Sequence, residues 1–318
     1  MTISILYQNG QADEATIEAL IAAHRNESFA WLHIHGRSED ARALVGRFAE
    51  VPAAAADTLT QQETRPRASV MGNAALINLR GPGEMLAQDS DPLVSIRIWA
   101  QHGLVISVGY RELDALADVK EKARRGEIAD PGDLIAAIAS TITDELDPDV
   151  ANMGDCIDDI ESMLDPENAA EARSRITQTR SRAIAYRRFL APQRQALERL
   201  SLANVGWLGE DDKLHIQEAA DRCARMVEEL EAIRERAALT HEALTDLRAE
   251  QMNQRALMLS IVALVFLPLT FITGLLGMNV KGIPYSDAPW AFWGVTGLCA
   301  AIAIGVTAWF AAAHWLKR

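Results

Sequence analysis

Small and polar residues recur at helical spacing in an otherwise apolar stretch near the C-terminus. They are Asn253, Ser260, Ala263, Thr270 and Gly274, and Leu267 shares their spacing; these six residues are called the polar row below. Their spacing, which alternates between three and four residues after an initial seven, places them on one face of an α-helix. Such a face offers hydroxyl and amide oxygens and room for water, so it could line a path for ions. It could also serve close packing between helices, because small residues allow that as well.

The tripeptide Gly277-Met278-Asn279 follows the polar row directly. A glycine and an asparagine favour the left-handed residue that often ends a helix, so the helix is predicted to stop here. The same residues also suit cation binding. Amide oxygens of Asn279 and backbone carbonyl oxygens can hydrogen-bond the water shell of a divalent ion without stripping it.

Two uncharged stretches at the C-terminus are long enough to cross a membrane. The first, Ala256–Met278, would rise about 35 Å as a helix, against about 30 Å for the hydrocarbon core of a bilayer. The second, Ala288–His314, ends just before two basic residues. Pro268 removes one backbone hydrogen bond from the first helix and should bend it. A chain with two spans cannot hide a polar face from lipid, so we expect an oligomer around a central axis.

Basic residues near these stretches predict their orientation. Arg248 and Arg255 precede the first stretch, and Lys317 and Arg318 follow the second, whereas the loop at residues 280–287 carries one basic residue. Basic residues favour the cytoplasmic side, so both termini are expected in the cytoplasm and the loop outside it. In a Gram-negative cell this is an inner-membrane protein with a periplasmic loop. The start of the chain lacks the features of a signal peptide.

The region before the first span is predicted to be helical. Acidic residues without a basic one run from Asp144 to Glu171, and arginines without an acid follow from Arg173 to Arg194, above a continuing apolar stripe. We expect a helical hairpin over residues 147–211, broken near Asp165-Pro166. The acidic run is interpreted either as a solvated helix face or as a sink that concentrates cations.

A heptad pattern then leads towards the membrane. Its apolar positions are Ala219, Cys223, Met226, Leu230, Ile233, Ala237, Thr240, Leu244 and Leu247. The pattern predicts a coiled-coil seam or a stripe packed on neighbouring helices. No proline or glycine occurs from Asp212 until Pro268, so a stalk at residues 212–255 could continue into the first span at 256–279 as one helix about 100 Å long.

Residues 1–146 are predicted to form a cytosolic α/β domain. The expected strands are Ile3–Tyr7, Ser28–His35, Ala68–Leu79, Leu93–Ala100 and Leu104–Tyr110. The expected helices are Asp13–His24, Glu39–Phe48, Pro52–Gln62, Glu112–Arg124 and Pro131–Leu146. Neither a phosphate-binding glycine loop nor a nucleophile–base pair is evident, so we expect no enzyme.

Histidines are the candidate zinc ligands outside the polar row. His33 and His35 share one face of a predicted strand and could chelate zinc together. His215 and His241, on the stalk, could make transient contacts with zinc. No cluster completes a tetrahedral site, and the three cysteines lack paired spacing. We therefore expect no permanently bound metal and no disulfide framework.

The tripeptide in its context resembles the signature of the CorA-type divalent-metal transporters, in which it stands between two C-terminal spans. The string FLPLTFITGLLGMNVKGIP is similar to the zinc-transporting ZntB branch, as are the segments Ser95–Trp99 and Leu190–Arg194. The resemblance implies a homopentamer whose pore lies on the first span. The residues that it carries over are Asn253, Leu267, Thr270, Gly274 and Asn279.

The expected fold is therefore an α/β domain with a long helical stalk and two transmembrane helices, assembled as a CorA-like pentamer in lipid. The expected cargo is Zn²⁺, with Mg²⁺, Co²⁺, Ni²⁺ and Cd²⁺ as further ions. The resemblance implies proton-driven movement, for which uptake is the favoured direction. A net charge of −13 argues against nucleic acid as a partner.

Two alternatives remain at this point. The first is an Mg²⁺ or Co²⁺ channel of the same architecture. Against it, this chain has Leu267 where magnesium-type relatives tend to have methionine, and its loop carries Lys281 with a single acid, Asp287. The second is a membrane-anchored coiled-coil signalling or scaffold protein, which would need neither the polar row nor the tripeptide.

Overall fold

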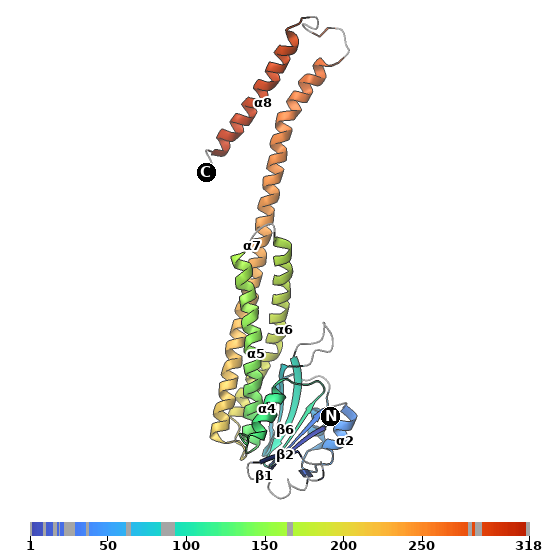
Figure 1. Cartoon of the computed structure of the whole chain (residues 1–318), viewed down its shortest axis with the longest axis vertical. Coiled ribbons are helices and arrows are strands. Elements are labelled where there is room, and N and C mark those ends of the chain that lie inside the picture. Colours follow the sequence, from blue (N-terminus) through green and yellow to red (C-terminus); the bar gives the residue numbers. More distant parts are fainter. Residues whose placement is uncertain are drawn as a thin grey trace. The chain divides into compact units, whose positions relative to one another are not determined.

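The computed structural model describes residues 2–8, 11–14, 18, 20–21, 29–35, 38–61, 65–83, 93–163, 168–278, 282–283 and 288–315 (Figure 1). The chain divides into two compact units. The first comprises Met1–Leu164 and Ala170–His241, and the second comprises Asp165–Ala169 and Glu242–Arg318.

The first unit is built on a mixed sheet, which has seven strands within the described residues, in the order β2-β1-β3-β7-β6-β5-β4. The strands are β1 Thr2–Gln8, β2 Gln11–Glu14, β3 Ala30–His35, β4 Arg67–Met71, β5 Ala74–Pro82, β6 Leu93–Gln101 and β7 Leu104–Gly109. Strands β3 and β7 pair in parallel, with His35 opposite Gly109, whereas β1 and β3, like β6 and β7, pair antiparallel. The centre of the sheet therefore contains a parallel pair, which a tight hairpin turn cannot join and which needs a crossover connection.

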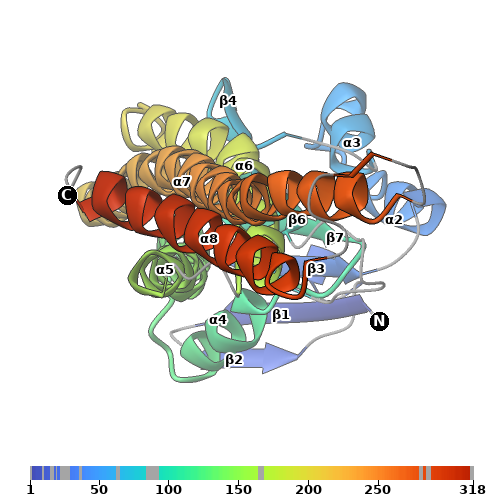
Figure 2. The ribbon, with the colours of Figure 1, turned by 90° about the horizontal axis from the view of Figure 1, so that it is seen from above.

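Helices cover both faces of this sheet. Figure 2 shows α2 (Ser38–Val45) and α3 (Ala53–Leu59) on one side, and α4 (Ala115–Arg124) and α5 (Pro131–Ser162) on the other. All six residues of β7 are buried, which is the pattern of a strand covered on both faces. Because alternate residues of a strand face opposite ways, Leu32 belongs to the core under α2 and α3, and its neighbour His33 faces the α4 side.

The structure corrects two of the predicted elements. The single strand expected at Ala68–Leu79 is the hairpin β4–β5, and its turn contains Gly72 at φ +65°, a conformation that favours glycine. The helix expected from Asp13 begins too early, because Asp13 lies in β2 and pairs with Leu6 of β1. The local preference for helix is overridden there because β1 has a free edge with which this segment pairs. Most of the rest of that predicted helix lies outside the described residues.

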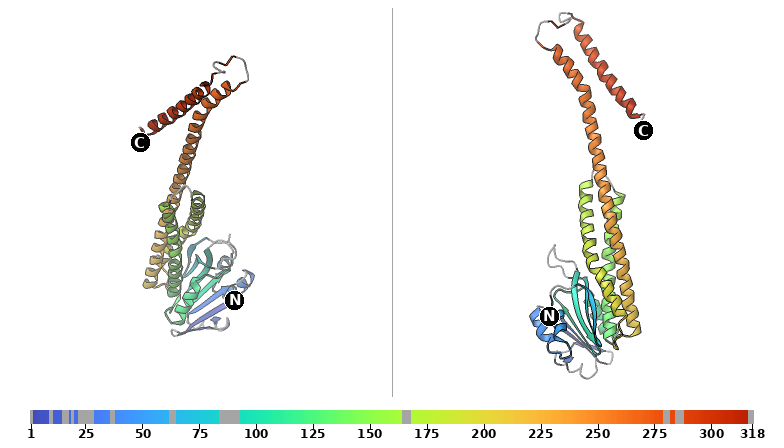
Figure 3. Two further views of the ribbon diagram at one scale, coloured as in Figure 1. Left: turned by 45° about the horizontal axis from the view of Figure 1, so that its top comes forward. Right: turned by 180° about the vertical axis from the view of Figure 1, so that it is seen from behind.

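Three long helices form a bundle in the first unit: α5, α6 (Ala169–Ser201) and the first part of α7 (Glu210–Leu276). They lie side by side in Figures 1 and 3. Helix α5 runs without a break through the division predicted between residues 146 and 147, so the sheet and the expected hairpin share one helix. That division and the others along the chain stay predictions.

The heptad stripe of α7 is buried at Ala219, Cys223, Met226, Leu230, Ile233, Ala237, Thr240 and Leu244, and Leu247 is half-buried. Within the first unit, polar contacts tie α7 to its neighbours in the same chain. Arg236 Nη2 lies 2.5 Å from Glu161 Oε2 of α5, and Thr240 donates a 3.0 Å hydrogen bond to the other oxygen of Glu161. Arg187 of α6 contacts Glu231 of α7 at 2.6 Å. The stripe is therefore packed on neighbouring helices of its own chain, the second of the two readings.

The second unit contains the rest of α7 and α8 (Ala291–Trp315). Both helices are long and apolar enough to cross a membrane. Large apolar side chains such as Phe266, Phe271, Trp293 and Trp309 are exposed on them. The predicted α/β domain, long helix and two apolar C-terminal spans are confirmed: the second part of α7 is the first apolar span, and α8 is the second. The expected boundary between stalk and first span, at residues 255 and 256, falls inside the uninterrupted α7.

Glu145 of α5 should make stability depend on pH. Burial, followed by the charges of Asp114 and Asp118, raises the pKa of Glu145 to about 7. Since the unfolded carboxyl titrates near 4.5, the folded state alone keeps this proton between about pH 4.5 and 7, and stability falls as the pH rises through that window. Glu145→Gln should remove this loss, so its advantage in unfolding temperature over wild type should be larger at pH 7.5 than at pH 4.5.

Thermal unfolding followed by circular dichroism measures this advantage. The exposed neighbour Asp147→Asn is the control and should follow the wild-type pH profile. Parallel profiles for wild type and Glu145→Gln would contradict the assignment.

Candidate functional site

The polar row lies on a single face of α7 in the second unit. At about 100° per residue, its six members fall within an arc of about 100° around the helix axis. All six are exposed, and Leu267 retains 69% of its accessible surface. The partly covered residues of this segment, Ile261, Val265, Pro268, Leu269 and Ile272, are centred about 150° away. Within one chain, the polar face is thus left uncovered while the apolar face opposite is partly buried.

Backbone and hydroxyl groups in this segment provide oxygens beside the row. Ser260 donates a 2.9 Å hydrogen bond to the carbonyl of Ala256, which satisfies its hydrogen and leaves the hydroxyl oxygen able to accept. Pro268 has no N–H, so the carbonyl of Leu264, four residues earlier, loses its usual helical partner. Leu264 stands at the edge of the row. The sequence analysis did not include this carbonyl, although Pro268 indicates that the carbonyl four residues earlier lacks its helical partner.

Helix α7 ends at Leu276, directly before the tripeptide, as predicted. The N–H of Gly277 donates to the carbonyl of Thr273 at 2.9 Å, and a Cβ on Gly277 would lie 2.9 Å from that same oxygen. Gly277 is therefore required by close approach, and it does not adopt the expected left-handed conformation. That conformation occurs at Gly282, with φ +111°. Met278 is exposed, and Asn279 lies outside the described residues, as do Lys281 and Asp287.

The four candidate histidines are not gathered in one place. His33 and His35 lie together at the end of β3 in the first unit. His215 is exposed on α7, where its Nδ1 lies 3.4 Å from Glu218 Oε2. His241 is half-buried on the same helix, about 39 Å from His215 along the axis. Of the four histidines, the structure thus brings only His33 and His35 close together.

An acidic cluster of Asp130, Asp133 and Asp212 has the geometry to hold a metal ion, since its carboxylate oxygens lie within 4.8 Å of one another. Each carboxylate already accepts a backbone N–H at the start of a helix. Asp130 accepts from Asp133 at 3.0 Å, Asp133 from Ala129 at 2.8 Å, and Asp212 from Gly209 at 2.8 Å. These bonds are those of N-terminal caps on α5 and α7, so helix capping accounts for the cluster.

Comparison with known proteins places the chain in a transporter family. A family model described as CorA-like Mg²⁺ transporter protein matches residues 26–318. The chain belongs to this family, as the tripeptide and its neighbouring segments indicated.

Among its relatives, the zinc transport protein ZntB of Pectobacterium carotovorum subsp. carotovorum is 32% identical over 294 residues, which cover 92% of this chain and 88% of the relative. The divalent cation transporter CmaX of Pseudomonas aeruginosa is 34% identical over 270 residues, with 84% and 81% covered.

Solved structures agree with this placement. The structure of full-length CmaX matches with a TM-score of 0.78 and 30% identity, covering 99% of this chain and 98% of that one. The CorA magnesium transporter from Methanocaldococcus jannaschii also matches with a TM-score of 0.78, over 98% and 97% of the two chains, but at 16% identity it supports the fold alone.

Capping and metal binding at Asp130 predict different mutational outcomes. Asparagine caps a helix about as well as aspartate, so Asp130→Asn should leave stability nearly unchanged, whereas Asp130→Ala should cost about 1 kcal/mol. Chemical denaturation of the detergent-purified protein, with and without a metal chelator, measures both. A similar loss in the two variants, or a wild-type stability that falls on chelation and no longer does so in Asp130→Asn, would contradict the capping role.

Proposed function

We propose that this protein carries divalent cations across a membrane and that its cargo is Zn²⁺. Membership of the transporter family supports the class of function, and the relatives named as zinc transport proteins support the ion. The observation that carries the proposal is the uncovered polar row on an apolar helix that ends in Gly277-Met278. A family of transporters also fits the expectation that the chain is no enzyme.

The polar row becomes a pore when several copies of the chain face one another. Polar groups in hydrocarbon are costly unless they meet water or partner groups, and an oligomer around an axis supplies both. We take five copies, the number that the family resemblance implies. The row then lines the path with the side chains of Asn253, Ser260, Ala263, Leu267, Thr270 and Gly274, and the freed carbonyl of Leu264 adds an oxygen at its edge.

These groups suit an ion that keeps much of its water. The row contains no carboxylate, imidazole or thiolate, the groups that hold Zn²⁺ tightly. Hydroxyl, amide and carbonyl oxygens can hydrogen-bond the first water shell, which is favourable enough for passage and weak enough for release. A transporter must release its ion, so weak neutral contacts serve it better than a closed site.

The tripeptide is the proposed mouth of this pore. In the orientation set by the basic residues, both termini are cytoplasmic and residues 280–287 form a periplasmic loop of an inner-membrane protein. A ring of Gly277-Met278-Asn279 would meet ions before the row does, with the Asn279 amides contacting the water shell. Close packing of Gly277 against the carbonyl of Thr273 gives this ring a defined backbone.

An Mg²⁺ or Co²⁺ channel is the nearest alternative, and the family description itself names Mg²⁺. Apart from Leu267, the side chains of the row do not choose between these ions. Zinc is preferred on the names of the relatives and on Leu267, which departs from the methionine of magnesium-type relatives. Proton-coupled uptake is part of the proposal and rests on the family resemblance.

Zinc influx into proteoliposomes tests the proposal. Influx should rise with an inward proton gradient, and Asn279→Ala should reduce it about tenfold, the effect of losing roughly 1.4 kcal/mol of hydrogen bonding to the hydrated ion. Asn204→Ala, at an exposed residue of the first unit, is the matched control and should transport like wild type. Light scattering of the purified protein should give the mass of five chains.

The alternatives predict different results. Magnesium flux without zinc flux would place the protein among the channels of the same architecture. Flux of neither ion would favour a membrane-anchored scaffold.

A further inference from the structure

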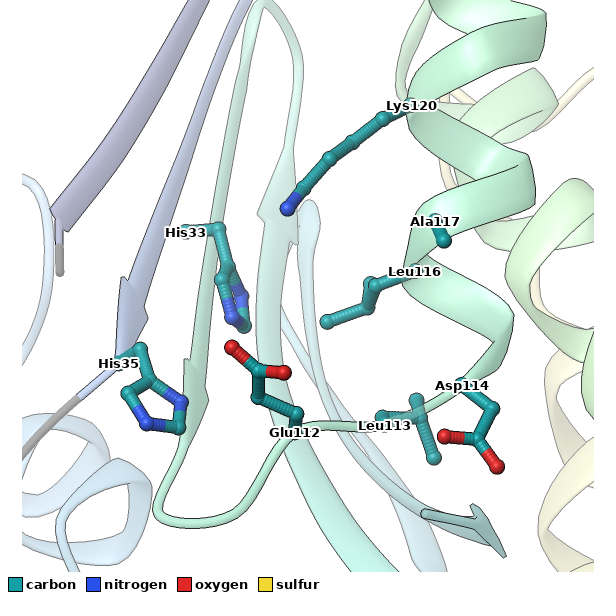
Figure 4. A pocket seen from close by; sticks show the side chains of 8 residues that line it. All are labelled: His33, His35, Glu112, Leu113, Asp114, Leu116, Ala117 and Lys120. Atoms are coloured by element: carbon teal, nitrogen blue, oxygen red, sulfur yellow. The ribbon is translucent and has the colours of Figure 1, made fainter. Parts of the chain in front are cut away.

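A cavity of about 320 Å³ in the first unit is lined by residues that transport through the polar row does not use. It lies between the end of β3, the loop after β7 and helix α4 (Figure 4). Strands β3 and β7 are a parallel pair, and the helices that follow them, α2 and α4, lie on opposite faces of the sheet. In α/β sheets, the crevice beyond the carboxyl ends of two such strands is where ligands commonly bind.

His33 is the fixed group in this cavity. Its side chain is 5% exposed, and its Nδ1 lies 2.8 Å from Ser107 Oγ, which also accepts the indole N–H of Trp31 at 2.9 Å. Within the described part of the chain, no residue hydrogen-bonds the other ring nitrogen, Nε2. A Cβ on Gly109 would lie 3.9 Å from Nε2, so a glycine there keeps that side open.

The second ring nitrogen of His33 can serve as a metal ligand in the neutral imidazole, which keeps a lone pair on one ring nitrogen. When Nδ1 carries the proton, Ser107 Oγ can accept both N–H groups with its two lone pairs, and Nε2 is left as a metal ligand. A hydrogen bond of this kind on the second nitrogen is the usual support of a metal-binding histidine.

Two further residues beside His33 could supply ligand atoms to a metal ion. His35 follows two residues later on the same face of β3, about 6.6 Å along the strand, and is half-buried. Glu112 comes from the loop after β7, and Figure 4 shows its carboxylate pointing toward the His33 ring. The lining also contains two acids, Glu112 and Asp114, against one base, Lys120.

We propose that this cavity is a binding site for one Zn²⁺-class cation, held by His33 Nε2, His35 and Glu112. Two imidazoles and one carboxylate form the three-ligand set that zinc accepts with a fourth position left to water. Among the described residues, the three ligand atoms that lie within 4.8 Å of one another belong to Asp130, Asp133 and Asp212. The side chains of the proposed site must therefore move closer together to share one ion. The half-buried His35 and the exposed Glu112 rotate toward the buried His33.

This site is separate from the polar row, and the proposal does not depend on which ion the protein transports. Bound metal would join the end of β3 to the loop that leads into α4. The segments that the bound metal would hold together lie entirely within the first unit.

Metal titration of the full-length protein in detergent tests the site. Co²⁺ serves as a spectroscopic probe, because four-coordinate Co²⁺ with imidazole ligands absorbs visible light far more strongly than the hydrated ion. We expect one such Co²⁺ per chain, displaced by Zn²⁺. His35→Gln and Glu112→Gln should each weaken Zn²⁺ binding at least tenfold, measured by competition with a coloured chelator. Glu112 is exposed and His35 is only half-buried, so these variants should fold even if His33→Gln does not.

His102→Gln is the matched control, since His102 is an exposed histidine of the same sheet, in the turn between β6 and β7. It should bind Co²⁺ and Zn²⁺ like wild type. Unchanged Zn²⁺ affinity in both His35→Gln and Glu112→Gln, or an equal loss in His102→Gln, would overturn the proposal. Zinc flux in the same preparations reports on transport separately, so normal flux with unchanged binding would remove this site and leave the transport function standing.

Discussion

Hydrocarbon offers no hydrogen-bond partner, and the membrane part of this protein depends on that constraint. A helix satisfies its own backbone, so a polar side chain within it must be explained by what covers it. The polar row of α7 is exposed in one chain, whereas the apolar side chains opposite are partly buried. A chain of two apolar helices cannot cover that row by itself. Self-association around water resolves the conflict, and a water-lined axis through a membrane is a path for ions.

The first unit is governed by charge and burial together. Acidic residues of α5 are paired in part with arginines of α6 and α7, for example Glu161 with Arg236 and Asp149 with Arg182. Such partly exposed pairs add little stability, because water screens them and ordering long side chains is costly. They sit beside the buried heptad stripe, which contributes most of the packing. The acidic run is thus in part a set of ion-pair partners for α6 and α7, a use beyond the solvated face or cation sink that its composition indicated.

Long periodic patterns in the sequence predicted the fold well. The stalk heptad, the two apolar stretches and most of the strands are present where they were expected, because each buries a stripe or a face that repeats many times. Short elements were harder to predict from the sequence. Asp13 lies in a strand because an edge was free to pair with it, and Gly72 turns the chain back inside the stretch Ala68–Leu79 that was predicted to be one strand. Both outcomes are hairpins between strands that are adjacent in sequence, so they depend on where the chain turns.

The candidate sites show the same division. The polar row could be found from spacing alone, since a helix fixes which residues share a face. The pairing of His33 and His35 was also visible, but Glu112, Ser107 and Trp31 were not, because the parallel pairing of β3 with β7 brings them together. At Gly277 the residue type was informative, while its reason differed: contact with the Thr273 carbonyl, and no left-handed turn, requires glycine there.

Thiol accessibility during zinc flux tests most directly whether the polar row lines the pore. In a background with Cys156, Cys223 and Cys299 replaced by alanine, single cysteines are placed at Leu267 and Gly274 on the row and at Val265 and Ile272 opposite. A membrane-impermeant thiol reagent added outside should block flux through the first pair and leave the second pair unaffected. Block through Val265 and Ile272, with Leu267 and Gly274 insensitive, would contradict the assignment of the pore to this face.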